Sequence, residues 1–177
     1  MSLRFRLSLL PVVLAFSLAT AFAKVAPVPF NQLVRQSSVI VLARVESVKP
    51  RLLRPLGDRY ARARVIEVWK GPANLAKIEF LASPTWTCDI ADAQVGETAV
   101  LFLQWDAREN RYNIAHSGRG RMAIREITGT QLATIWRDVR LPEGTATEAG
   151  PEPQFDFIRS IAVPVLKKLV VEATSSV

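Results

Sequence analysis

Residues 98–105, Thr-Ala-Val-Leu-Phe-Leu-Gln-Trp, form a dense apolar run in the middle of the chain. A run in which successive residues are apolar is typical of a β-strand that is buried on both faces. The stretch from Ser38 to Glu46 alternates instead, with valines on one face and Arg44 and Glu46 on the other. That alternation predicts a strand with one face on a core.

The next strand, predicted over residues 60–69, changes phase along its length. Alternation holds as far as Val65, and the apolar positions then shift by one residue to Ile66 and Val68. A slip of one residue inside a strand indicates a bulge or strong coiling, as barrels require.

The remaining pattern is one of short strands separated by turns. A helical turn capped by Asn31 and a C-terminal helix with Pro164 in its first turn flank them. We expect further strands at residues 77–80, 112–116, 122–127 and 131–136, the last two joined by a turn at Thr128-Gly129. Such a series indicates a small sandwich or barrel, and periodicity does not choose between the two.

The N-terminus resembles a secretory signal. Arg4 and Arg6 precede an apolar stretch over residues 7–19, and Ala21 and Ala23 occupy the positions that a signal peptidase reads. Cleavage is expected after Ala23. An uncleaved membrane anchor is the alternative, and the shortness of the apolar stretch argues against it. We therefore expect a secreted or periplasmic protein with no integral membrane segment after cleavage.

Composition excludes several classes of protein. The 177 residues include 23 basic and 16 acidic side chains, one Cys and one His. A single Cys excludes an internal disulfide framework and multi-cysteine metal sites. Residues 1–23 hold two of the basic side chains and none of the acidic ones, so the mature chain carries a net charge of +5.

Four segments in order resemble a known family. They are residues 38–45, residues 59–71 ending in Trp-Lys-Gly, residues 83–88 (Ser-Pro-Thr-Trp-Thr-Cys), and residues 96–102 beginning Gly-Glu-Thr. The set resembles the netrin-like modules of tissue inhibitors of metalloproteinases (TIMPs) and exported bacterial proteins of the same shape. It covers about half of the mature chain.

The resemblance implies an OB-fold barrel. We therefore expect a mostly β protein, with a five- to six-stranded OB-fold-like barrel, an extra hairpin and a C-terminal α-helix. The expected divisions are a signal peptide (residues 1–23), the barrel (24–140), and a Pro/Gly/Glu-rich loop followed by the helix, which packs on the barrel (141–177).

The departures from the family decide the expected function. In TIMPs an N-terminal Cys, paired by a disulfide to the Cys that matches Cys88, chelates the target's zinc. Here the mature chain begins Lys24-Val25-Ala26-Pro27. We expect a non-enzymatic module that binds an extracytoplasmic protein. It is inhibitor-like in shape but lacks the chelating Cys. Its binding residues are expected to be Lys24, Val25, Trp86, Thr87 and Cys88.

Cys88 leaves several alternatives open. It could form an inter-chain disulfide, act as a nucleophile with His116, bind a metal with His116, Asp89 or Asp92, or remain a buried thiol. The enzyme interpretation requires Cys88 and His116 to lie within reach of each other. We expect no catalytic residue, metal or cofactor.

A basic stretch predicts a second kind of binding. The stretch covers the first long loop and the start of the strand predicted over residues 60–69. In OB-folds this loop and this strand lie on the ligand-binding face, and here an aromatic ring stands among the cations. The partner would be an anionic polymer or envelope glycan. Nucleic acid is not expected for an exported protein. A solvated strand face is the simpler interpretation. The residues concerned are Lys49, Arg51, Arg54, Tyr60, Arg62 and Arg64.

The four tryptophans all fall at predicted strand ends or in loops. Such residues usually cap a small core. Trp86, between two threonines in a long connection, is the best candidate for an exposed anchor. The others are Trp69, Trp105 and Trp136.

Overall fold

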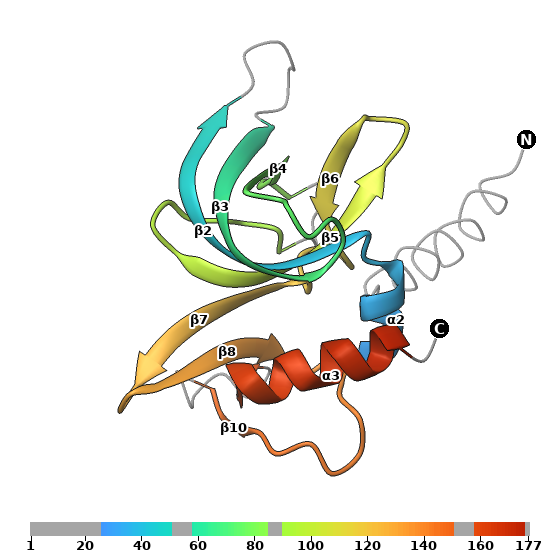
Figure 1. Ribbon diagram of the computed structural model, residues 1–177, viewed down its shortest axis with the longest axis vertical. Helices are drawn as coiled ribbons and strands as arrows, with labels where there is room; N and C mark the ends of the chain where they lie inside the picture. Colours follow the sequence, from blue (N-terminus) through green and yellow to red (C-terminus); the bar gives the residue numbers. More distant parts are fainter. Residues whose placement is uncertain (1–25, 51–57, 85–89, 151–157, 176–177) are drawn as a thin grey trace, which may run out of the picture.

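A computed structural model describes residues 26–50, 58–84, 90–150 and 158–175 (Figure 1). Most of its elements are strands. In chain order they are β1 (Val28–Pro29), α2 (Phe30–Gln36), β2 (Val39–Pro50), β3 (Arg59–Lys70), β4 (Lys77–Leu81), β5 (Thr98–Asp106), β6 (Arg111–Ile114), β7 (Arg121–Ile127), β8 (Thr130–Trp136), β9 (Val139–Arg140), β10 (Glu148–Ala149), β11 (Ile158–Ala162) and α3 (Val163–Ser175).

Five strands close a barrel in the order β2, β3, β4, β6, β5. The ring closes because β5 pairs with β6 and also with β2. The pairs are antiparallel except β4 with β6, which is parallel. This barrel, with extra strands outside it and a C-terminal helix, confirms the predicted mostly β, OB-fold-like architecture.

β5 is buried on both faces, as its apolar run predicts. Leu101 contributes to the core inside the barrel, and its neighbour Phe102 contributes to a second core outside. β2 behaves in the same way over its first half, where Val41 faces inward and Ile40 faces the second core. The prediction of a single buried face was therefore wrong for this half of β2. The outer face of this half is buried because the second sheet covers it.

β3 contains the predicted bulge. Val65 pairs with Ala43 and Glu67 pairs with Leu42, so Ile66 has no opposite residue on β2. Ile66 is 52% exposed. The extra residue bends the strand, which allows β3 to follow the curvature of the barrel.

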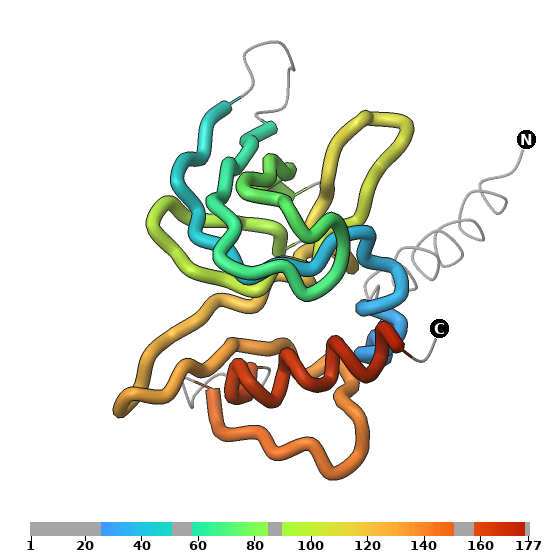
Figure 2. The backbone as a smooth tube through the Cα atoms, in the orientation of Figure 1, coloured from blue at the N-terminus to red at the C-terminus, as the bar shows by residue number. Residues whose placement is uncertain are grey.

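The second core lies between the barrel wall, an outer sheet and two helices. The first half of β5 pairs with β7, and the sheet continues through β8, β11 and β10. Figure 2 shows α3 alongside β8 and next to α2. Leu33 of α2 and Leu166 and Val170 of α3 are fully buried in this core. Lys167 of α3 also forms an ion pair with Glu67 of β3.

The helix ends and the hairpin turn test local predictions. α2 begins at Phe30 after Pro29, with no side-chain cap, so the predicted cap by Asn31 is wrong. Thr128 and Gly129 have φ of 48° and 79°, the left-handed values of a tight hairpin turn, as predicted. Neither described helix has the length and apolar character needed to traverse a bilayer.

Candidate functional site

The five residues expected to bind a partner protein lie in two segments, the start of the mature chain and the connection between β4 and β5, which together we call the predicted rim. The described chain starts at Ala26, and the second of these segments, the β4–β5 connection (the second connection), is described up to Pro84 and again from Ile90. The predicted contact residues themselves lie outside the described residues: Lys24, Val25, Trp86, Thr87 and Cys88.

The start of the chain is held by a short parallel strand pair. Val28 of β1 pairs with Val139 of β9, and the Val28 N–H donates to the carbonyl of Asp138 at 2.8 Å. Val28 is buried, whereas Ala26 and Pro27 are exposed. The backbone is therefore fixed from Val28 onward.

The end of the second connection is held by a tight turn. The Ile90 N–H donates to the carbonyl of Ser117 at 3.1 Å. His116, Ser117 and Gly118 have φ of 49°, 50° and 86°, all in the left-handed region. A Cβ on Gly118 would lie 2.3 Å from the Ala91 nitrogen, so only glycine lets the two backbones approach this closely.

Arg119 joins these two backbone segments. Its side chain is buried, and its Nε donates to Oδ2 of Asp138 at 2.9 Å. One Nη donates to the carbonyl of Ser117 at 3.1 Å. Asp138 also accepts the N–H of Val28, and Ser117 also accepts the N–H of Ile90. A single guanidinium therefore connects the segments that flank the two halves of the predicted rim.

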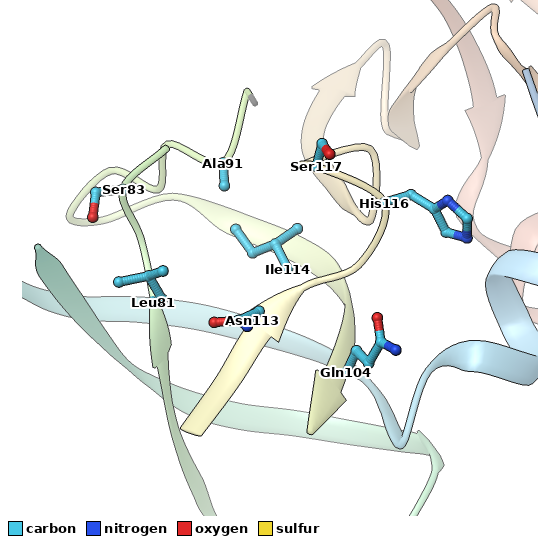
Figure 3. A pocket seen from close by; sticks show the side chains of 8 residues that line it. All are labelled: Leu81, Ser83, Ala91, Gln104, Asn113, Ile114, His116 and Ser117. Atoms are coloured by element: carbon cyan, nitrogen blue, oxygen red, sulfur yellow. The ribbon is translucent and has the colours of Figure 1, made fainter. Parts of the chain in front are cut away.

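A small polar pocket of about 170 Å³ lies beside this turn (Figure 3). It is smaller than the roughly 300–1,000 Å³ of typical small-molecule sites. Ser83 Oγ accepts the N–H of Arg59 at 3.0 Å. Figure 3 shows Ser83 and His116 at opposite ends of the group, with Ile114 between them. They therefore do not form a nucleophile and base pair. The lining residues are Leu81, Ser83, Ala91, Gln104, Asn113, Ile114, His116 and Ser117.

His116 is partly buried in this turn. Burial lowers its pKa, and the nearby charge of Arg119 lowers the pKa further. Its Nε2 is buried and has no hydrogen-bond partner within the described part of the chain. Among the described residues, no group of three His, Cys, Asp or Glu side chains could hold a metal ion.

The described part of the basic stretch carries matched charges. Arg51 and Arg54 lie outside the described residues, and Lys49 is exposed near the end of β2. Arg62 and Arg64 of β3 are exposed and face carboxylates on both neighbouring strands. The ion pairs are Arg62 with Glu79 at 3.3 Å and Arg64 with Glu46 at 3.6 Å.

Tyr60 is turned away from a role among these cations. Its hydroxyl accepts a hydrogen bond from Arg111 of β6 at 3.1 Å, and Arg111 also pairs with Asp58 at 3.2 Å. The predicted row of arginines and an aromatic ring is present on β3, but its members have partners on three other strands.

The described tryptophans divide into two groups. Trp69 is buried and donates its Nε1–H to Glu67 at 2.9 Å, and Trp136 packs against the second core with Arg119 over its ring. Both therefore support the core, as predicted. Trp105 does not, because its side chain is 43% exposed.

Two features were missed by the sequence reasoning. The Arg119–Asp138 bridge has no signal in the sequence, since 19 positions separate its members. Trp105 does have a signal, because it ends the apolar run at residues 98–105 and Tyr112 begins the next predicted strand, and the two pair with each other. No protein-family model matches the chain, and no curated protein sequence is significantly similar to it.

Proposed function

We propose that this protein is an exported, non-enzymatic module that binds a partner protein through one rim of the barrel. The rim comprises the start of the mature chain (residues 24–28) and the end of the second connection (residues 85–91). The main support is the Arg119–Asp138 bridge, because it ties the flanks of both segments to one buried ion pair.

A rim with fixed flanks suits protein recognition. Fixed anchors lower the entropy that a segment loses when a partner binds. Trp86 would supply the large aromatic contact that commonly dominates such interfaces, and Lys24 would supply a charge at the edge.

The resemblance to TIMPs supports the same two segments. In those inhibitors a disulfide joins the N-terminus to the loop that Cys88 matches. Here the Arg119–Asp138 bridge joins the flanks of the corresponding segments without a covalent bond. Since the mature chain begins with Lys24, recognition would proceed without zinc chelation by an N-terminal Cys.

The test is affinity capture with matched variants. The mature chain, tagged at its C-terminus, is exposed to the medium and envelope fraction of the source cells, and bound proteins are quantified by mass spectrometry. Wild type and Trp105→Ala should capture the same proteins, and Trp86→Ala should lose them. Equal capture by wild type and Trp86→Ala would refute the rim.

The alternative, recognition of an anionic polymer by the basic stretch, gains no support from its described residues. Arg62 and Arg64 already face carboxylates, which offset two of the five positive charges of the stretch. If this binding exists, retention on a heparin resin should collapse with salt and in the Arg62→Glu/Arg64→Glu variant. Elution at the same salt concentration as a neutral control protein would exclude this binding.

A further inference from the structure

An aromatic ridge stands near the end of β5 and the start of β6. Trp105 of β5 and Tyr112 of β6 pack edge to face, with ring centroids 4.9 Å apart. Trp105 remains 43% exposed despite this contact. A tryptophan held rigidly and still open to solvent offers a flat surface for stacking.

The ridge separates two grooves. One, of about 340 Å³, lies between Trp105 and β3 and β4, and Tyr60 and Tyr112 line it. The other, of about 360 Å³, lies between Trp105 and the β5–β6 turn. Both volumes fall within the range of small-ligand sites. Together they form an open track that crosses the indole.

The polar groups along the track are balanced in charge. The first groove holds Lys77, Glu79 and Arg111, and the charge of Arg111 is matched by its ion pair with Asp58. The second groove holds Asp106 and Arg108. Amide side chains complete both grooves, Asn110 in the first and Gln104 in the second. This mixture favours a neutral ligand with many hydroxyl groups over a nucleic acid or an acidic polymer, which would require an excess of cations.

The ridge is already ordered by hydrogen bonds. Asp106 Oδ1 accepts the N–H groups of Arg108 and Glu109 at 3.0 and 3.2 Å, which fixes the β5–β6 turn. The backbone N–H of Trp105 donates to Ser38 Oγ at 3.0 Å, which fixes the end of β5. Arg111 is tied to Tyr60 at 3.1 Å. Little conformational entropy remains to be lost on binding.

We propose that the track centred on Trp105 binds a neutral oligosaccharide. One sugar would place its apolar C–H face on the indole, where the negative face of the ring attracts polarised C–H groups. Its neighbours on either side would lie in the two grooves, and their hydroxyls would bond to the charged and amide side chains. This binding is independent of the proposed rim, since neither groove includes a residue of the rim.

Titration with short neutral oligosaccharides tests the proposal. Chitohexaose, cellohexaose and maltohexaose are added separately to the ¹⁵N-labelled mature protein, and the indole N–H signals are followed by NMR. At least one oligosaccharide should bind and shift the Trp105 signal more than those of the other tryptophans. No shift with any of them at about 10 mM, well above a millimolar dissociation constant, would overturn the proposal.

Variants separate stacking from general effects on the fold. Trp105→Ala should weaken binding about tenfold or more, since stacking on an aromatic ring is commonly worth that much. Trp105→Phe should retain most of it, and Ile66→Ala, an exposed apolar change elsewhere on the barrel, should leave it unchanged. Equal affinity of wild type and Trp105→Ala, or binding only to a heparin fragment, would overturn the proposal.

Discussion

Replacing Gly118 with alanine should loosen the connection that leads from the predicted rim. Two costs combine at this position. Its φ of +86° is one that residues with a Cβ adopt only at about 1–2 kcal/mol. The new Cβ would also lie 2.3 Å from the Ala91 nitrogen and 2.4 Å from the Ile90 carbonyl carbon. These are backbone atoms, so the whole connection must move.

Gly96 supplies the matched control. Its φ is +87°, and nothing lies within 4 Å of the position of a Cβ. Gly96→Ala therefore carries the conformational cost alone. Gly118→Ala adds the displacement of residues 90–91 and the loss of the hydrogen bond from Ile90 to Ser117, about 1 kcal/mol by itself. We expect Gly118→Ala to lower the free energy of unfolding by at least about 2 kcal/mol more than Gly96→Ala.

Urea denaturation of both variants measures this difference, and hydrogen exchange locates it. The Ile90 amide should lose protection in Gly118→Ala and keep it in Gly96→Ala. If the two variants lose the same free energy of unfolding, the close approach of the backbones at Gly118 is not a constraint, and the account of the turn is wrong.

Three further predictions concern α3, the single histidine and the ion pair on β3. Leu166→Ala should lower the free energy of unfolding by about 2–5 kcal/mol, because Leu166 is fully buried, whereas the exposed Val171→Ala should change it by less than about 0.5 kcal/mol in the same denaturation assay. The pKa of His116 is lowered below its usual 6.5, so the unfolded chain takes up the proton first. The free energy of unfolding should therefore fall as the pH drops below about 6.5. In His116→Asn, denaturation curves measured over the same pH range should show a smaller fall. Hydrogen bonds from Lys167 and from the indole beside it lower the pKa of Glu67 below 4.5. Glu67→Gln should therefore reduce stability by at most about 1 kcal/mol above that pH and by progressively less as the pH falls through the lowered pKa, since both charged side chains are more than 40% exposed.

The architecture could be predicted because its main features are local in the sequence. The run at residues 98–105 reports burial on both faces directly, since each neighbour in a strand points to the opposite side. The phase slip after Val65 reports the bulge in the same way. The prediction of a closed ring rested on the resemblance to TIMPs, because the alternation of apolar and polar residues is the same in a sandwich and in a barrel.

The candidate sites were less accessible to sequence reasoning because they are made by distant residues. Arg119 and Asp138 meet only once β8 has folded back along β7, and the sequence gives no spacing rule for such a contact. Trp105 was predicted to cap the core because strand ends usually do so. The hairpin instead pairs it with Tyr112, which supports one side of the indole and leaves the other open to solvent.

The sharing of β5 between two cores has a consequence for cooperativity. Leu101 and Phe102 are neighbours in the chain, yet each belongs to a different core. A shift of β5 that moves one of these side chains therefore also moves the other. A chain that ended at residue 140 would lose β11 and α3, and with them Ile161, Leu166 and Val170 from the core that covers the outer wall of the barrel at Phe102 and Ile40. The C-terminal segment should therefore stabilise the barrel, and the two cores should melt in one transition.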